Sequence, residues 1–372
     1  MMRRAAVAAA VVAALAVVGG CATFPDEGPR DWRPKAEGQG ELGGPPALSP
    51  SGEPAPPPSG QQPPPSSSGG SSSPQPCVDP DPQVVATCLA PVGAIAVLPT
   101  GDEALVGERT TGRVLQVKKG TPPREVTRVP VDPATGLTGL VLSPGYAEDR
   151  LVYALAGTPT DGQVLRLAPG EPPKPVLTGL PKAARMAVDV DGSLLVATGA
   201  GEGPLAGAVL RIDTLGRPAP GNPDPASPVL SRGVSAPGGV CVDPMDRTVW
   251  VTDRAGSRDV LHRVTPGTLG PPAWTWPDAP GVAGCAVLPG TLAVTERRAG
   301  ALFVLRPGDN GTFTGDPQPV LTGTYGALSS AATAPDGLLW LGTANRDGGR
   351  PGATDDRVIR IQPPAGGGGS AA

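Results

Sequence analysis

Apolar and polar positions between residues 77 and 364 repeat with a regular period. In each unit an apolar run ends at a turn residue, a second apolar run follows, and a third closes the unit. The turn residues are Pro99, Pro144, Val190, Pro244, Pro289 and Pro335, so that successive units lie 45, 46, 54, 45 and 46 residues apart. Short strands and turns at this period predict an all-β fold, a six-bladed β-propeller over residues 77–364.

Three strands are expected in each unit. The first strands are predicted at residues 94–98, 140–143, 186–189, 240–243, 285–288 and 331–334. The second strands are predicted at residues 104–106, 151–154, 194–197, 248–251, 292–294 and 338–341. The third strands are predicted at residues 114–117, 164–167, 209–212, 260–264, 302–305 and 358–361. The last unit lacks an outer strand, and we expect residues 84–87 to supply it, which would protect the edge of the final blade.

The N-terminus has the pattern of an export signal. Arg3 and Arg4 precede an Ala, Val and Leu run that ends at Gly20 and is shorter than the roughly 20 apolar residues that span a bilayer. Residues 1–20 therefore predict a cleaved signal peptide. Small residues directly before Cys21 resemble a lipobox, which predicts a lipid on that thiol, whereas an ordinary signal peptide that happens to hold a cysteine is the alternative. We expect an exported protein that is lipid-anchored to the outer face of the cell membrane or cell envelope.

Composition changes the picture for the segment between the anchor and the first repeat. The chain holds 54 Gly and 51 Pro residues, a level typical of disorder. Gly, Pro and Ser supply 27 of the 36 residues from 41 to 76, so residues 21–76 predict a lipidated N-terminus and disordered tether. Residues 365–372 are expected to form a second disordered tail. Much of the unusual composition therefore lies outside the predicted propeller.

Charge and histidine content exclude several function classes. A formal net charge of −4 argues against the excess of basic residues that is typical of nucleic-acid-binding proteins. The single histidine, His262, lies on a predicted third strand where other units carry Gln or Arg, so a peripheral position is expected. We accordingly predict no catalytic residue and no metal site. A monomer is expected.

Four cysteines remain after Cys21, and an exported chain favours their pairing. They are Cys77, Cys88, Cys241 and Cys285. Three pairings are possible. Cys77 and Cys88 flank the predicted closing strand, and the other two lie on first strands of neighbouring units, so we favour 77–88 and 241–285.

Acidic residues next to arginines follow several second strands. These candidate residues are Glu108, Arg109, Asp253, Arg254, Glu296, Arg297, Arg298, Arg346 and Asp347. In a propeller the loops after second strands gather on one face, around the mouth of the central channel. There the charged groups either bind a polyol or a partner's polar surface, or pair with one another and tie blades together, which we favour. Trp274 and Trp276 are expected on a loop, where core packing is favoured over stacking on a sugar.

Several segments resemble the glucose/sorbosone dehydrogenase family. They are residues 138–153, 207–213, 236–251 and 334–361. This resemblance implies a six-bladed propeller that binds pyrroloquinoline quinone (PQQ) and Ca²⁺ and oxidises aldoses. A narrower resemblance, to mycobacterial-type lipoproteins, rests on Cys77 and Cys88 and on residues 143–146, 274–278 and 280–285.

The residues that the family's chemistry requires are mostly replaced in this chain. Pro181 occupies the position of the family's general base, a His, whose loss would lower the rate by roughly 10²–10⁴-fold. Positions that the resemblance assigns to quinone-binding Arg or Gln hold Ala134, Ser235, Ala327 and Ser329, while Arg298 keeps a basic side chain. The sequence therefore predicts a non-catalytic module that has no cofactor. We expect this module to bind an envelope glycan or protein. The alternative is a PQQ- and Ca²⁺-dependent aldose dehydrogenase with a divergent site.

Overall fold

The computed structural model describes residues 77–308, 312–315 and 317–364. The predicted signal peptide, the lipidation site at Cys21, the tether and the C-terminal tail lie outside these residues. Among the residues that the structure describes, no helix is long and apolar enough to cross a membrane.

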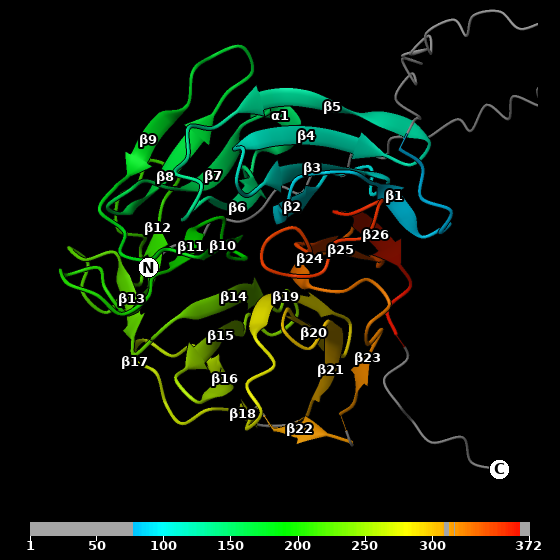
Figure 1. The fold of residues 1–372 in the computed structure, drawn as a ribbon. Coiled ribbons are helices and arrows are strands. Elements are labelled where there is room, and N and C mark those ends of the chain that lie inside the picture. The colour runs from blue at the N-terminus through cyan, green and yellow to red at the C-terminus, as the bar shows by residue number, and fades with distance from the viewer. Residues whose placement is uncertain (1–76, 309–311, 316, 365–372) are drawn as a thin grey trace, which may run out of the picture. The chain divides into compact units, whose positions relative to one another are not determined.

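Six sheets, each hydrogen-bonded within itself, surround a central axis (Figure 1). Blade 1 contains β2 (Val92–Val97), β3 (Glu103–Glu108), β4 (Arg113–Lys118) and β5 (Thr121–Arg128). Blade 2 contains β6 (Leu137–Leu142), β7 (Val152–Gly157), β8 (Gly162–Leu167) and β9 (Lys174–Leu177). Blade 3 contains β10 (Arg185–Val188), β11 (Leu194–Ala197), β12 (Ala208–Ile212), β13 (Val229–Arg232) and the short β17 (Gly267–Thr268).

The other three blades repeat this up-and-down order. Blade 4 contains β14 (Pro237–Val242), β15 (Val249–Ala255), β16 (Arg258–Arg263) and β18 (Trp274–Trp276). Blade 5 contains β19 (Val282–Leu288), β20 (Thr291–Glu296), β21 (Ala301–Pro307), β22 (Phe313–Thr314) and β23 (Pro319–Val320). Blade 6 contains β24 (Leu328–Thr333), β25 (Leu339–Thr343), β26 (Val358–Ile361) and β1 (Val84–Ala86). The predicted six-bladed, nearly all-β architecture is confirmed.

The N-terminal strand closes the ring, as predicted. β1 pairs antiparallel with β26, placing Val84 opposite Ile359 and Ala86 opposite Val358. Figure 1 shows these two strands side by side although they come from opposite ends of the propeller sequence. The backbone of Leu89 also exchanges two hydrogen bonds of 3.0 Å with that of Asp356. The outermost strand of the last blade is therefore supplied by the first residues of the domain.

The innermost strands approach one another closely around the axis. Each of β2, β6, β10, β14, β19 and β24 contacts the next, and β24 contacts β2. Two glycines show how tight this packing is. A Cβ at Gly239 would lie 2.8 Å from the backbone N of Cys285, and one at Gly284 would lie 2.8 Å from that of Ala331. Residues without a side chain are needed where two backbones come this near.

The hydrophobic core is divided among the blade interfaces. Six clusters of buried residues each span two neighbouring blades, and together they cover every interface in the ring. The cluster between blades 4 and 5 is rich in aromatic residues. There Trp274 and Trp276 pack against Phe303, with ring centroids 5.8 and 5.4 Å away. Core packing of both tryptophans agrees with the favoured interpretation, but they lie on β18 and not on a loop as predicted.

Both predicted disulfides are present. Cys77 bonds to Cys88 and Cys241 bonds to Cys285, with Cα–Cα distances of 6.2 and 5.8 Å. The second bond joins β14 to β19, the innermost strands of blades 4 and 5. The disulfides therefore fix the start of the ring and one blade interface.

Several element boundaries differ from the sequence prediction. Five of the six first strands begin two or three residues earlier, at Val92 and Leu137 for example, because their ladders include a register shift near their start. In blade 3, β10 begins one residue earlier and its ladder is regular. The outer strands of blades 1–5 were not predicted, and neither was the short helix α1 (Tyr146–Asp149). These outer strands are short or exposed and lack the apolar alternation that marks the inner ones.

Candidate functional site

The channel mouth is built from two sets of loops. One set enters the first strand of each blade, and the other joins the second strand to the third. Backbone hydrogen bonds connect the two sets, as in Arg109 N to Pro91 O (2.7 Å), Arg297 N to Gly281 O (2.8 Å) and Ala344 N to Ala327 O (2.9 Å). The charged residues predicted from the acid–arginine pairs therefore lie at the same end of the propeller.

Two acids of these pairs, Glu108 and Asp253, are buried and bind the backbone. Glu108 is 1% exposed and accepts hydrogen bonds from Ala90 N (3.0 Å) and the Thr111 hydroxyl (2.6 Å). Asp253, also 1% exposed, accepts from Ser235 N (2.8 Å) and Ala236 N (2.5 Å). In both cases the carboxylate satisfies donors in the segment that enters the first strand of its own blade. These acids hold the loops in place and do not line a ligand site.

The arginines of the pairs point away from the neighbouring acids, since adjacent residues of a strand face opposite sides of the sheet. Arg109 Nε and Arg297 Nη2 both form 2.8 Å ion pairs with Oδ2 of Asp347. Arg254 donates to Pro237 O at 3.0 Å, and Arg298 donates to Ala279 O at 2.7 Å. Asp347 thus bridges blades 1 and 5 from blade 6, which agrees with the expectation that charged pairs tie blades together.

A cavity of about 370 Å³ opens at this mouth. Its lining includes Arg254, Arg297, Arg298 and Asp347, with three glycines and Ala327. Arg254 and Arg298 have no ion pair within the described part of the chain. Three guanidiniums and one carboxylate line the cavity, so its lining is positively charged, while the carboxylates of Asp253 and Asp259 act on Arg254 from outside the lining. Such a surface is suited to carboxylate or phosphate groups, which guanidinium binds in a bidentate manner.

A further arginine crosses the axis beneath the mouth. Nη1 of Arg185 donates to the carbonyl oxygens of Thr138 (2.8 Å) and Gly93 (3.2 Å). Its Nη2 donates to Ser329 O at 2.9 Å, so the side chain reaches strands of blades 1, 2 and 6. Burial, reinforced by the charges of Arg254, Arg297 and Arg109, lowers the pKa of Arg185 to about 9. The space around it on the axis is only about 50 Å³.

Arg185 was not among the candidate residues predicted from the sequence. A signal existed, because Arg185 is the first residue of an inner strand whose counterparts in other blades are apolar or small. The local sequence could not show that the guanidinium of Arg185 reaches backbone carbonyls of three other blades.

Glu296 has an unusual protonation equilibrium. Its side chain is buried at the end of β20 and 3% exposed. Burial, together with the nearby carboxylates of Asp278 and Asp259, raises the pKa of Glu296 to about 7. Asp259 itself accepts hydrogen bonds from Gly281 N (2.6 Å) and Val282 N (2.9 Å). Asp259 was not predicted, because it lies on a third strand, β16, and not directly after a second strand.

The remaining predicted residues are placed as follows. Arg346 is exposed and its Nε donates to Asp355 O at 2.7 Å. His262 is half-buried on β16, where its Nδ1 lies 3.1 Å from Gly270 O. The Ser329 hydroxyl donates to Val92 O (2.7 Å) and thereby supports the inner strands. Among the described residues, no three His, Cys, Asp or Glu side chains are grouped so that they could hold a metal ion.

Solved structures with the same fold are numerous, although no family model and no curated protein sequence matches the chain. The PQQ-bound form of aldose sugar dehydrogenase from Streptomyces coelicolor is 30% identical, with a TM-score of 0.70 over 75% of this chain and 96% of that one. A putative oxidoreductase (glucose dehydrogenase) from Thermus thermophilus is 29% identical, with a TM-score of 0.68 over 75% and 98% of the two chains.

A third similar structure is the apo form of the soluble aldose sugar dehydrogenase from Escherichia coli. It is 18% identical, with a TM-score of 0.64 over 75% of this chain and 99% of that one, and this likeness concerns the fold alone. The six blades, the order of their strands and the 30% identity over nearly the whole Streptomyces coelicolor chain lead to one conclusion. The chain belongs to the aldose sugar dehydrogenase family of six-bladed propellers, the glucose/sorbosone dehydrogenase-like group.

Proposed function

We propose that this chain is an exported lipoprotein, anchored through Cys21 to the outer face of the cell membrane, whose propeller binds an envelope partner without catalysis. The partner binds at the channel mouth and is a glycan or a protein that carries acidic groups. The observation that carries this proposal is the cavity lined by Arg254, Arg297 and Arg298, whose positive charge Asp347 balances only in part.

The energetics of the mouth favour an acidic ligand. Burial lowers the pKa of Arg254, and the charges of Arg297 and Arg298 act in the same direction, while the carboxylates of Asp259 and Asp253 oppose the shift. A ligand carboxylate or phosphate would add a further negative charge beside the three guanidiniums and accept hydrogen bonds from them. Each such charge-assisted bond contributes about 1.5–3 kcal/mol. A neutral polyol of equal size would gain less from the same side chains.

The alternative is a PQQ-dependent aldose dehydrogenase with a divergent site. The guanidiniums of the mouth fit the carboxylates of such a quinone. The proton acceptor does not fit, because Pro181 stands at the matching position and its side chain has no basic atom. His262 lies on a third strand with its Nδ1 at the Gly270 carbonyl. The described residues therefore do not fit a working quinone centre.

Binding is tested with a pair of matched probes on the full-length protein in detergent. Oligogalacturonate carries a carboxylate on every sugar, and its methyl ester has the same backbone without charge. We expect oligogalacturonate to bind at least tenfold more tightly than the ester. Replacing Arg298→Gln should weaken that binding about tenfold, while the control Arg217→Gln, at a 71% exposed side chain in an ion pair with Asp213, should not change it. Equal affinity for the two probes would contradict an acid-binding mouth.

Catalysis is tested on the same preparation after addition of PQQ and Ca²⁺. We expect no reduction of an electron-accepting dye when glucose or another aldose is added. Aldose-dependent dye reduction would overturn the non-catalytic proposal and support the dehydrogenase.

The lipid anchor is tested by a separate variant. Cys21→Ala should abolish incorporation of labelled palmitate and release the protein from the membrane fraction.

A further inference from the structure

A second cavity lies away from the channel mouth, between blades 1 and 2. Its volume is about 450 Å³. The lining comes from strands β3, β4, β5, β7 and β8, from the turn after β2, from α1 and the residue that follows it, and from the turn between β8 and β9. These turns lie at the end of the blades opposite the mouth loops. The cavity shares no lining residue with the mouth cavity and is a separate feature.

The cavity exists because the outer parts of blades 1 and 2 are filled by small side chains. At the equivalent interface of blades 4 and 5, Trp250, Trp274 and Phe313 pack against one another with ring centroids 5.5 and 6.0 Å apart. Between blades 1 and 2, the cluster of buried residues consists of Ala, Val and Leu. Tyr146, from α1, is the one aromatic side chain in the cavity lining and leaves the remaining space open.

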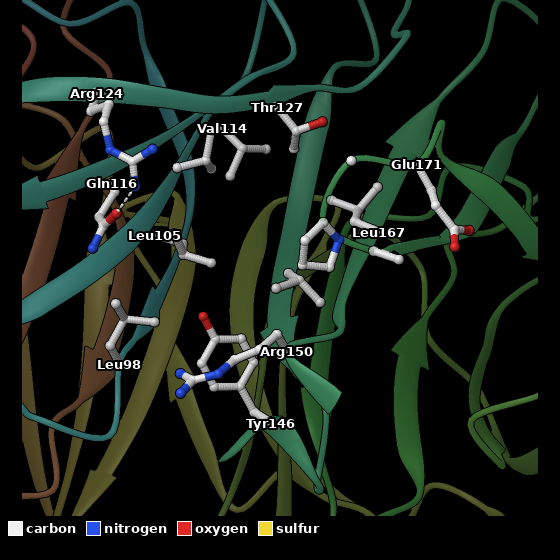
Figure 2. A pocket seen from close by; sticks show the side chains of 15 residues that line it. Leu98, Leu105, Val114, Gln116, Arg124, Thr127, Tyr146, Arg150, Leu167 and Glu171 are labelled. Carbon is white, nitrogen blue, oxygen red and sulfur yellow. Dashed lines mark hydrogen bonds between the residues drawn. The ribbon is translucent and has the colours of Figure 1, made fainter. Parts of the chain in front are cut away.

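The floor of the cavity is apolar. Leu105, Val114 and Leu167 belong to the buried cluster of this interface, and they are 6%, 1% and 6% exposed. Val126 on β5 also lines the cavity and is 39% exposed, an unusual level for a valine on a strand of this propeller. Figure 2 shows Leu98 and Leu105 on one side and Leu167 on the other, with the Tyr146 ring between them at the lower edge. An apolar body of a ligand would bury surface against these side chains.

Two guanidiniums stand at the rim. Arg124 donates to Oε1 of Gln116, and the Arg150 guanidinium lies over the Tyr146 ring, 5.5 Å from its centroid (Figure 2). Neither arginine has an ion pair among the described residues. The only acid in the lining, Glu171, is paired with Lys174. The rim therefore carries two positive charges that the protein does not neutralise.

The position of Arg150 is fixed by its neighbours. Arg150 ends α1 in the left-handed conformation, and its N donates to Tyr146 O at 3.1 Å. The carboxylate of Asp149 is occupied by the Ser143 hydroxyl (2.6 Å) and by Leu151 N (2.8 Å). This turn holds Tyr146 and Arg150 beside the apolar floor, while Asp149 is engaged in holding the turn.

We propose that this cavity binds a free single-chain carboxylic acid, a fatty-acid-like amphiphile. Its apolar chain lies against Leu105, Val114 and Leu167, and its carboxylate binds Arg124 on the β5 side of the rim, while Arg150 stands across the cavity beside Tyr146 (Figure 2). The chemistry follows from the combination of an apolar floor with unpaired guanidiniums at the rim. A cation would be repelled there, and a neutral molecule would give neither guanidinium an acidic partner. The proposal is independent of the function assigned to the mouth.

The test uses a photoreactive probe on the full-length protein in detergent. The probe is a diazirine-bearing dodecanoic acid, compared with the alcohol of the same chain. We expect the acid to label the protein saturably, on β5 or on the turn at residues 169–171, and the alcohol to label it about tenfold less at equal concentration. Equal labelling by acid and alcohol, or adducts that map outside this cavity, would overturn the proposal. Equal labelling by a photoreactive phosphatidylglycerol would overturn the choice of a single-chain ligand.

Two sets of variants make the test specific. The double variant Arg124→Gln/Arg150→Gln should reduce acid labelling about tenfold and leave alcohol labelling unchanged. Its control is Arg128→Gln, an exposed arginine on the same strand that does not line the cavity. Val126→Asp should also reduce acid labelling, because it adds a negative charge beside the carboxylate, whereas Val190→Asp, at a valine that is 41% exposed elsewhere, should not. Unchanged labelling of the double variant and of Val126→Asp, with both variants folded by circular dichroism, would disprove the site.

Discussion

Asp347 controls how much positive charge the channel mouth presents. Its carboxylate receives Arg109 from blade 1 and Arg297 from blade 5, both at 2.8 Å. Because the carboxylate is 25% exposed, each pair contributes at most about 1 kcal/mol. The value of the arrangement is therefore mainly geometric, since it orients Arg297 toward the cavity and leaves Arg254 and Arg298 available to a ligand.

Glu296 makes the stability of the propeller depend on pH. Its pKa is about 7 in the folded protein and 4.5 in the unfolded chain, so the folded state binds more protons between these values. The free energy of unfolding therefore falls as pH rises from 4.5 to 7 and stays reduced above that. We expect Glu296→Gln to raise the free energy of unfolding at pH 8 by about 1–3 kcal/mol, with little effect at pH 4.5. Urea denaturation at the two pH values measures this.

The matched control for this prediction is Glu148→Gln, an exposed carboxyl on α1. It should change stability by less than about 0.5 kcal/mol at either pH. If Glu296→Gln destabilised the protein equally at pH 4.5 and pH 8, the carboxyl would be acting through shape or hydrogen bonding and not through its charge.

The sequence predicted which residues lie at the mouth but not how they are used. Residues that follow second strands must gather at one end of a propeller, so the positions of Arg254 and Arg297 followed from the repeat. Whether a side chain binds backbone, as Asp253 does, or faces the cavity depends on its direction at the strand end. Arg185 and Asp259 were missed for the same reason, because their partners lie on other blades.

At the scale of elements, the sequence of the inner strands largely determines the fold. Turn residues at regular spacing and buried apolar runs made these strands predictable from sequence. The outer strands lack that signal. β5 has seven exposed positions out of eight and one half-buried, and β22 and β23 each have two residues. Their pairing depends on the edge offered by the preceding strand, which a local pattern does not reveal.

The disulfide between β14 and β19 is expected to stabilise the interface of blades 4 and 5. Its cysteines are 44 residues apart and belong to the buried aromatic cluster. Closing a loop of that length restricts the unfolded chain by about 3–4 kcal/mol. Replacing both residues, Cys241→Ala/Cys285→Ala, should lower the free energy of unfolding by about 2–4 kcal/mol in non-reducing urea denaturation. If this variant unfolded at the same urea concentration as the wild type, the bond would contribute nothing to stability.

At the scale of the whole domain, stability depends on a closed ring. Every interface between neighbouring blades has its own buried cluster, so each blade is supported on both sides. The closure is made by a strand of three residues, β1, whose Val84 is 7% exposed and packs in the cluster between blades 5 and 6. Val85 and Ala86 belong to the cluster between blades 6 and 1. One short strand therefore supports two interfaces at once.

This arrangement predicts a large effect from a single change in β1. In Val84→Lys an apolar contact is lost and an unpaired ammonium would have to be buried, which together cost about 2–4 kcal/mol. The unfolding temperature should fall by roughly 5–10 °C. The amides of β26, which pair with β1, should lose protection from hydrogen exchange before those of β15 in blade 4, because β26 becomes a free edge. The control Val78→Lys, at a valine that is 68% exposed, should leave both measurements unchanged. Uniform loss of protection across all blades would mean that β1 stabilises the ring only as a whole and that the last blade has no separate opening.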